Sequence, residues 1–405
     1  MHPRTFRITS LVAASLVVLG VGAFTPVAGA DSSTGPWVPP GFRATQIVSG
    51  SSLHHTFTPV VTTTGVATAT AAGTATEPLS KPDDVTRLGD ELFVGFQNGV
   101  GPQGEPSSDG NTASTIVEFS QSGHVLGQWD ITGKADGVTA DPALGAVIAT
   151  VNEDNNSSLY AIDPDASPFS AVTHYHYNEA LPHGGGTDAI SVVDGKLFIS
   201  ASAPGTVGLP APQPTYPAVY SVTLDPSDQV ATVTSLFNDE DPATVANVNG
   251  QAGTTTNLAL TDPDSSEVVP EGSPRFGGQF LLTSQGDQQQ IYVSDPGGPH
   301  QHLSVLSLSQ AVDDTAWATS WWGVLYATDS TNNTVDAVTG WFGPNRILVA
   351  ATPCGANGAL STCPANFLGS LDPWTGHVQR VDVDGQPFTP QGGLLFVPRF
   401  PGRDD

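Results

Sequence analysis

Basic residues are scarce in this 405-residue chain, which has 12 Lys and Arg against 39 Asp and Glu and a formal net charge of −27. This charge excludes a nucleic-acid-binding protein that works through a basic patch, because phosphate backbones repel an acidic surface. It also argues against docking on anionic membrane. Charged residues make up only 13% of the chain, which excludes a charge-rich disordered chain or a coiled coil.

Long apolar runs are confined to the N-terminus. An apolar run from Leu11 to about Gly22 follows a basic start, and Ala28-Gly29-Ala30 forms an A-x-A pattern just before Asp31. This arrangement predicts a secretory signal peptide, residues 1–30, that is cleaved after Ala30. A retained anchor is the alternative, but the run is short and rich in Ala and Gly. No later stretch is apolar enough to span a bilayer. We therefore expect a secreted protein whose residues 31–405 form one domain.

Cysteine is nearly absent, and the only two, Cys354 and Cys363, lie close together in the sequence. Outside the cytosol such a pair is expected to form a disulfide. It would close one short loop and contribute about 2–3 kcal/mol. A metal-binding or redox pair is the alternative, but the C-x-x-C spacing and partner ligands of such sites are missing.

Helical periodicity is also missing, and short apolar runs are instead broken by Gly, Asp and Pro. Several runs share one layout, in which a polar anchor precedes a strand, a tight turn and a second strand. The anchors are Asp83, Asp136, Asp188, Asn257 and Asp313, spaced 52 to 69 residues apart. Repeats of about 40–55 residues with four strands each are typical of β-propeller blades. We predict an all-β fold, a six-bladed β-propeller.

The two ends of the mature chain fit this fold. Residues 390–397 have the pattern of an inner strand, and residues 39–48 that of an outer strand with no inner strand before it. Together they would complete one blade and close the ring, which would leave no unpaired sheet edge. A seventh blade is the alternative, because Arg346–Ala351 and His377–Val383 are additional strand-like runs.

The Pro-Gly-Phe-x-Ala-Thr opening at Pro40–Thr45, the Asp-(Gly/Asp)-Val anchors and the Leu-Phe-(Val/Ile) second strands resemble those of NHL-repeat and gluconolactonase-like propellers, including streptogramin lyases. The resemblance covers roughly Pro39 to Pro398, as a pattern, and it is closest to an actinobacterial secreted branch. Gluconolactonase-like enzymes usually open with a Glu-Gly-Pro signature that supplies a metal ligand. Lys81-Pro82-Asp83-Asp84 stands at that place here.

Propeller geometry predicts that polar residues converge on the mouth of the central channel. The loops that enter each inner strand and the loops that follow each second strand share one face. These loops supply nine candidate metal ligands: Asp83, Asp136, Asp188, Asn257, Asp313, Asn98, Asn152, Glu153 and Asp329. They also supply Gln97 and Gln285. Such oxygen-rich groups could coordinate Ca²⁺, which takes six to eight oxygen ligands. Alternatively, each anchor aspartate caps the turn of its own loop.

Histidine is the usual general base in enzymes. His183 precedes Gly184-Gly185-Gly186 and the Asp188 anchor, so it is expected near the mouth. It is a candidate base or ligand, and a solvent-facing loop residue is the alternative. His174 and His176 alternate with tyrosines and are expected on the surface of an outer strand.

Two functions remain open at this stage, and the sequence does not decide whether the chain is an enzyme. The first is an exported propeller that binds a ligand or partner across its loop face, without chemistry. The second is a calcium-dependent hydrolase or lyase acting at the channel mouth, where a metal could polarise a lactone, ester or phosphate. Expected partners are a small molecule, a glycan or an extracellular protein, with no nucleic acid and no membrane span. We expect a monomer.

Overall fold

The computed structural model describes residues 41–63, 66–69, 73–182, 185–204, 215–248, 250–353 and 365–399. They belong to one compact unit, Pro40–Asp405. In these ranges every element is a strand except a three-residue 3-10 helix, Gly50–Ser52, so the all-β prediction is confirmed. No helix in the described part of the chain is long and apolar enough to cross a membrane. The predicted signal peptide and both cysteines lie outside the described residues and stay predictions.

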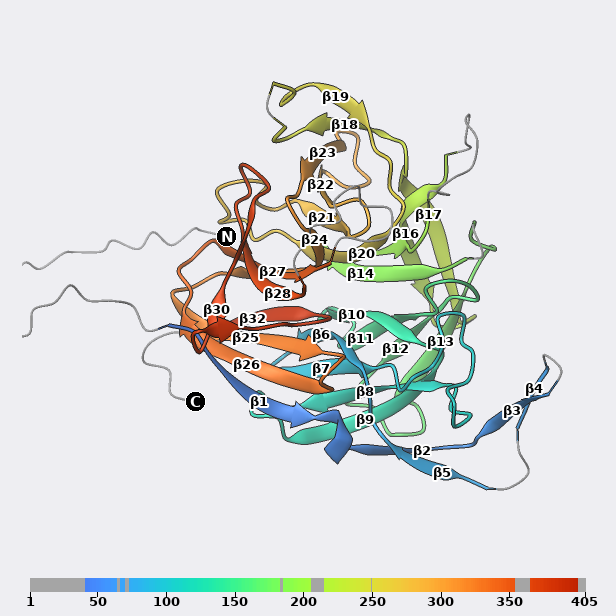
Figure 1. Cartoon of the computed structure of the whole chain (residues 1–405). Coiled ribbons are helices and arrows are strands. Elements are labelled where there is room, and N and C mark those ends of the chain that lie inside the picture. The colour runs from blue at the N-terminus through green and yellow to red at the C-terminus, as the bar shows by residue number, and fades with distance from the viewer. Residues whose placement is uncertain are drawn as a thin grey trace, which may run out of the picture. The chain divides into compact units, whose positions relative to one another are not determined.

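In the first three sheets, most strands pair antiparallel with their neighbours along the chain (Figure 1). Two parallel pairs join more distant strands, His176–Tyr177 with Val230–Ala231 and Thr244–Val245 with Ser304–Val305, and the first of them joins two four-stranded units into one eight-stranded sheet. One sheet has the order β6 (Pro82–Leu88), β7 (Glu91–Phe96), β8 (Ala113–Phe119), β9 (Val125–Thr132). The next contains β10 (Ala135–Asp141), β11 (Ala146–Val151), β12 (Ser158–Ile162), β13 (Val172–Tyr177), β17 (Val230–Asn238), β16 (Pro217–Asp225), β15 (Lys196–Ala201) and β14 (Thr187–Val193). The third contains β19 (Thr255–Asn257), β18 (Pro242–Val245), β23 (His302–Ser307), β22 (Gln289–Ser294), β21 (Phe280–Ser284) and β20 (Pro263–Val268).

The last two four-stranded sheets exchange strands along the chain. One has the order β24 (Ala311–Ala318), β27 (Arg346–Thr352), β28 (Phe367–Leu371), β29 (Val378–Arg380). The other has the order β1 (Arg43–Ser49), β26 (Thr334–Trp341), β25 (Trp322–Asp329), β32 (Leu394–Pro398). The terminal strands β1 and β32 therefore lie in one sheet, as predicted.

Two expectations about this region are corrected. The repeat layout assigns Val324–Ala327 to the Asp313 anchor as its second strand, but this run does not pair with the strand at Asp313, because β25 pairs with β26 and β32 while β24 pairs with β27. The run at Arg346–Ala351 is β27, in the sheet of β24 rather than in a sheet of its own.

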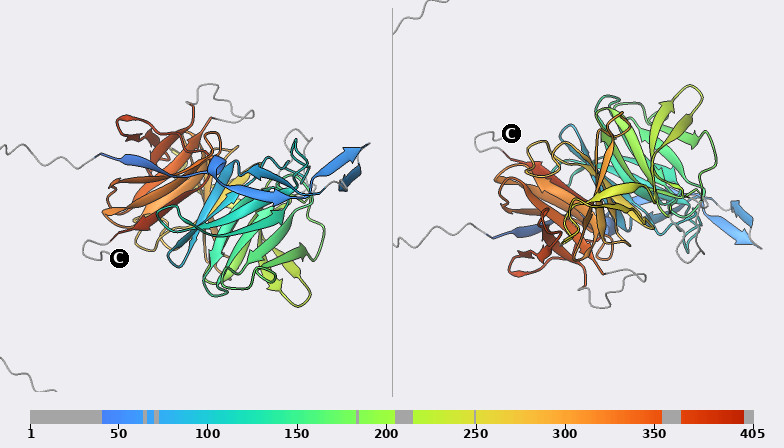
Figure 2. Two further views of the ribbon diagram at one scale, coloured as in Figure 1. Left: turned by 90° about the horizontal axis from the view of Figure 1, so that it is seen from below. Right: turned by 90° about the horizontal axis from the view of Figure 1, so that it is seen from above.

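The innermost strands of the sheets stand side by side in a ring. In order, β6, β10, β14, β20, β24 and β32 contact one another, and β32 returns to β6. Figure 1 shows the sheets arranged around this centre, and Figure 2 shows the same sheets from below and from above. The arrangement is a β-propeller.

The core lies between neighbouring sheets, whose middle strands are buried on both faces. All six residues of β11 are buried, and one apolar cluster joins Phe93 of β7, Ile116 of β8 and Val147 of β11. A second cluster joins Phe198 of β15 with Phe280 of β21. Strands covered on both sides by apolar neighbours explain the continuous apolar runs that the sequence shows in place of strict alternation.

A β-arm, residues 54–78, leaves the body between β1 and β6. It consists of the pair β2 (His54–Phe57) and β5 (Ala75–Pro78) and the pair β3 (Val60–Thr63) and β4 (Val66–Ala69) (Figure 1, lower right). His55, whose side chain is fully buried, fastens its base, with Nε2 3.0 Å from Glu77 Oε1 and Nδ1 3.3 Å from Asp130 Oδ1 of β9. Burial lowers the pKa of His55, but the two carboxylates outweigh it and the pKa is raised.

Candidate functional site

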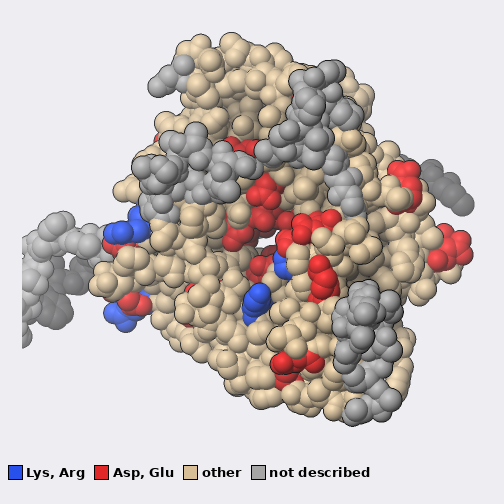
Figure 3. All heavy atoms as spheres, turned by 45° about the vertical axis from the view of Figure 1, so that its right-hand side comes forward, with Lys and Arg blue, Asp and Glu red and all other residues tan. Residues whose placement is uncertain are grey.

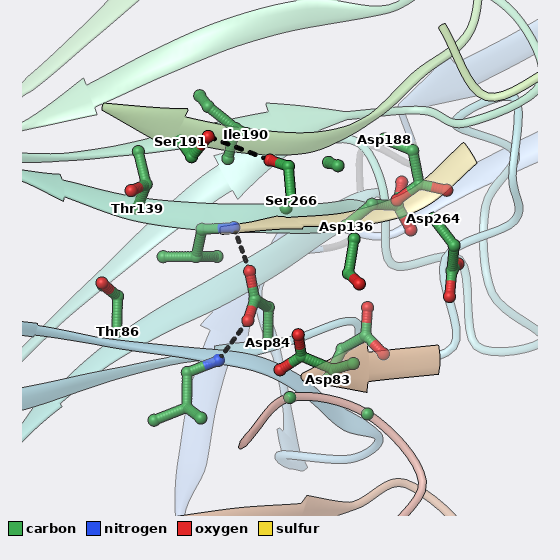
Figure 4. Close-up of a pocket in the computed structure, with 18 of the residues that line it drawn as sticks. Asp83, Asp84, Thr86, Asp136, Thr139, Asp188, Ile190, Ser191, Asp264 and Ser266 are labelled. Atoms are coloured by element: carbon green, nitrogen blue, oxygen red, sulfur yellow. Dashed lines mark hydrogen bonds between the residues drawn. The ribbon is translucent and has the colours of Figure 1, made fainter. Parts of the chain in front are cut away.

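The channel at the centre of the ring is lined by acidic side chains at the start of the inner strands. Strands β6, β10, β14, β20 and β24 each have a shift in register directly at this point. An extra residue in a bulge redirects the side chains beside it. The aspartates at these positions line one cavity of about 130 Å³: Asp83, Asp136, Asp188, Asp264 and Asp313. We call them the aspartate ring. Four of them point toward one another in Figure 4, and Figure 3 shows acidic side chains around a central opening.

Glycine replaces aspartate at the sixth place in the ring. Gly392 has φ +128°, a backbone conformation that favours glycine. A Cβ there would lie 2.5 Å from Thr328 Oγ1 and 2.7 Å from the Asp83 carbonyl oxygen. The close approach allows the Gly392 N–H to donate a hydrogen bond of 2.9 Å to Asp313 Oδ2. The C-terminal segment thus contributes a donor to the ring rather than another charge.

Two glutamine amides bridge neighbouring members of the aspartate ring. Gln97, after β7, donates from Nε2 to Asp83 Oδ2 at 2.9 Å and to Asp136 Oδ1 at 3.5 Å. Gln285, after β21, donates from Nε2 to Asp264 Oδ2 at 3.0 Å and to Asp313 Oδ1 at 3.1 Å. The loops after the second strands therefore do meet the starts of the inner strands, as the sequence predicts.

Lys134 contributes an ammonium group to the mouth of the channel. Its Nζ lies 3.0 Å from Asp136 Oδ1 and also contacts the carboxylate of Glu153. Burial by itself would lower the pKa of Lys134. The carboxylates of Asp136 and Glu153 have the larger, opposite effect, so the pKa is raised and the side chain stays charged. The other oxygen of the Asp136 carboxylate, Oδ2, is buried and has no hydrogen-bond partner. A buried oxygen without a partner is costly, so this oxygen is a candidate acceptor for a donor group of a ligand.

Burial is the main influence on the acidity of the ring. It raises the pKa of Asp83 to about 7, with Lys134 opposing the rise and Asp313 adding to it. The pKa values of Asp136, Asp188 and Asp264 are raised well above the usual range by burial and by neighbouring carboxylates. Closely spaced buried carboxylates cannot all ionise in a narrow channel. Asp83, Asp136, Asp188 and Asp264 therefore bind protons more readily than free carboxyl groups do.

A second group of carboxylates lies one or more residues further along the inner strands. Asp84 accepts hydrogen bonds from the N–H groups of Val85, at 2.7 Å, and Val138, at 2.6 Å. Asp314 likewise accepts from Thr315, at 2.6 Å, and Leu394, at 2.5 Å. Each of these aspartates thus ties its own strand to the next inner strand.

Glu267 of β20 is the third acid of this inner group. Burial, together with Asp314 and Asp84, raises its pKa well above the usual range. The sequence analysis missed Glu267 as well as Asp264 and Lys134. The Pro263-Asp264-Ser265-Ser266 run after a turn was the available signal for Asp264.

The prediction that Asn257 anchors an inner strand is wrong. It is exposed in the outer strand β19, which pairs with β18, and it does not line the channel. Asp264, at the start of β20, occupies the position that the sequence analysis assigned to Asn257.

Three loop candidates bind their own surroundings instead of the channel. Asn98 Nδ2 donates to Thr115 Oγ1 at 2.9 Å, and Asn152 Oδ1 accepts from the Lys134 N–H at 2.9 Å. Asp329 Oδ1 accepts from the N–H groups of the turn that follows it. Glu153 reaches the mouth through Lys134, whereas His183 lies outside the described residues. In the described part of the chain, no group of three or more His, Cys, Asp or Glu side chains has an arrangement that could hold a metal ion.

Comparison with known proteins finds likeness only in solved structures, since no family model and no curated protein matches the chain. A periplasmic gluconolactonase from Pseudomonas aeruginosa is 15% identical, with 79% of this chain and 89% of that one covered and a TM-score of 0.43. A chain of a nidogen/laminin complex is 10% identical, with 88% and 98% covered and a TM-score of 0.43. A Bacteroides caccae protein of unknown function is 8% identical, with 80% and 90% covered and a TM-score of 0.42. Similarity at this level carries no inference about activity.

Proposed function

We propose that the chain is an exported six-bladed β-propeller that binds a ligand with a positively charged group at the mouth of its channel and performs no chemistry on it. Six inner strands in one ring support the blade count. The A-x-A pattern at Ala28-Gly29-Ala30 supports export. The observation that carries the binding function is the buried, unpartnered Oδ2 of Asp136 at the mouth.

The chemistry of the ligand follows from what already stabilises the ring. The Lys134 ammonium pairs with Asp136 on one side of the mouth. The Gln97 amide donates to Asp83 and Asp136, and the Gln285 amide donates to Asp264 and Asp313. Asp188 is buried next to Asp136, and its pKa is raised well above the usual range by burial and by that neighbour. A second ammonium or guanidinium group would donate to both carboxylates and relieve their repulsion.

Binding is favoured over calcium-dependent hydrolysis by the arrangement of the ring. A calcium site needs six to eight oxygens around one point at 2.3–2.6 Å. In the described residues the carboxylates are spread around the channel and are held apart by amides and by Lys134, without a metal-holding group of three. We therefore derive no step through a metal.

Thermal unfolding of the exported chain, stripped with EDTA and kept at about 0.15 M salt to screen surface charge, tests this function. Spermidine, arginine methyl ester and Ca²⁺ are titrated separately. A ligand that binds only the folded state raises the unfolding midpoint, so we expect a saturable rise with the organic cations. The rise should vanish in Asp136→Asn and Asp188→Asn but persist in Asp228→Asn, which removes an exposed charge elsewhere.

Two outcomes would overturn the proposal. A saturable rise with Ca²⁺ alone that both ring variants abolish would replace the organic cation by a metal site. The absence of any rise, or a rise that Asp228→Asn weakens as much as the ring variants do, would show that the mouth binds no specific ligand.

A further inference from the structure

Two histidines lie side by side on β13 in the second sheet. Strands β11 and β12 separate β13 from the channel strand β10. His174 and His176 are two residues apart in β13, so they project from the same face of the strand. Their ring centroids are 4.4 Å apart with an interplanar angle of 60°. Two imidazoles this close can direct one nitrogen each at a common point about 2.0–2.1 Å away, the distance of a metal–imidazole bond.

The ring of His174 is held in place by the neighbouring strand. Tyr160 of β12 is its cross-strand partner, and the two rings stack with centroids 4.2 Å apart and an angle of 3°. His174 Nε2 lies 2.8 Å from Ser158 Oγ. A hydrogen bond from Nε2–H to the hydroxyl would fix the tautomer and leave the lone pair on Nδ1 available, which is the usual support of a metal-binding histidine.

His174 is half-buried beside the Tyr160 ring. His176 itself is exposed, which keeps the outer side of the pair open to solvent. This pair differs from isolated surface histidines because one ring is held by a hydrogen bond and a stacked ring while the other is exposed to solvent.

We propose that His174 and His176 form a two-imidazole site for a borderline transition-metal ion, with Cu²⁺ bound in preference to Ni²⁺ or Zn²⁺ and with water as the remaining ligands. Imidazole suits these ions, and the affinity of nitrogen sites is highest for Cu²⁺. Hard cations such as Ca²⁺ prefer oxygen ligands. The site is independent of the aspartate ring and of the ligand proposed for it.

The chain contains a matched control for this site. His300 and His302 have the same spacing in sequence, but His300 lies in the turn before β23 and only His302 belongs to the strand. The His300 N–H donates to Asp295 Oδ2 at 2.8 Å, which is part of that turn. If the spacing of the two histidines and the acidic surface of the protein were enough to attract metal, both pairs would bind it. If the strand geometry is required, only His174 and His176 would bind it.

The test is isothermal titration of the untagged exported chain with Cu²⁺, Ni²⁺ and Zn²⁺ in the presence of excess Ca²⁺. We expect one Cu²⁺ per chain at the tightest site, loss of that site in His174→Ala or His176→Ala, and no change in His302→Ala. Ser158→Ala should weaken Cu²⁺ binding by about 10-fold or more because it frees the tautomer of His174. Unfolding midpoints would verify that each variant is folded.

The result that would overturn the proposal is Cu²⁺ binding that survives in both His174→Ala and His176→Ala, or that His302→Ala reduces equally. Displacement of Cu²⁺ by Ca²⁺ would likewise assign the ion to surface carboxylates. Because these readouts do not involve the channel, they remain decisive whatever the aspartate ring binds.

Discussion

Lys134→Met removes the ammonium group from the mouth of the channel and leaves Asp136 with only the 3.5 Å contact from Gln97. The lysine and aspartate side chains are 15% and 3% exposed, so the pair is largely shielded from water. Removing one partner of a buried pair typically costs about 3–5 kcal/mol, because the remaining charge is buried alone. We expect a loss of this size in the free energy of unfolding at alkaline pH.

The loss should depend on pH, because Asp136 can escape its isolation by binding a proton. Lys134 lowers the pKa of Asp136 against the larger effect of burial, so the pKa rises further in the variant. In the pH range between the two pKa values only the variant must hold this proton. The cost of the mutation then grows with pH by up to about 1.4 kcal/mol per unit. The loss should therefore be smaller at pH 5 than at pH 8.

Urea unfolding of the two proteins at pH 5, 6, 7 and 8 measures this dependence. Lys196→Met is the control, since it makes the same chemical change at an exposed site at the start of β15, and it should change stability little at any pH. The double variant Lys134→Met/Asp136→Asn should recover much of the loss at pH 8. A loss that is equal at pH 5 and pH 8, or one that Asp136→Asn does not relieve, would refute the coupling of the two side chains.

Two further predictions concern acidity and the β-arm. Burial raises the pKa values of Asp83 and Asp314 to about 7. The folded state therefore keeps protons that the unfolded state releases above about pH 4, and these two groups should lower stability as the pH rises from about 4 to 7. Differential scanning calorimetry across pH 4–9 checks this, and a midpoint that rises over that range would contradict it. His55→Gln breaks the ion pairs at the base of the arm, so limited proteolysis should cleave within β2 or β5 faster than in the wild type, with unchanged cleavage in the propeller sheets.

Local pattern located most inner strands and paired β6, β10 and β14 with the second strand of their own repeat, but it gave β24 the wrong partner. The anchors Asp83, Asp136, Asp188 and Asp313 stand where the structure starts an inner strand, because each repeat has the same order of polar residue, strand and turn. The prediction for Asn257 was wrong because the β18–β19 hairpin precedes β20 and has a similar run of polar and apolar residues.

The strand exchange between the last two sheets was also beyond the reach of local pattern. The hairpin β25–β26 follows β24 directly in sequence but pairs in the neighbouring sheet. Hydrophobic pattern indicates that a segment is a strand, whereas pairing depends on contacts between segments distant in the chain. The sequence therefore predicted the terminal strands of the closing sheet, β1 and β32, without its two middle strands.

The candidate site shows the same division between what is local and what is long-range. That carboxylates and Gln97 or Gln285 would meet at one mouth followed from strand direction in a propeller. Which amide would bridge which carboxylates, and that Lys134 would pair with Asp136, depended on side-chain reach across neighbouring sheets.

Closure of the ring completes the hydrogen bonding of two channel aspartates. Asp313 and Asp314 of β24 receive donors from Gly392 and Leu394, which belong to the C-terminal segment. These donors are absent until that segment docks as β32, and the two carboxylates would then face the channel without them. The energetic penalty of an unsatisfied buried carboxylate thus opposes every partly closed state. The two aspartates of β24 therefore favour complete closure of the propeller.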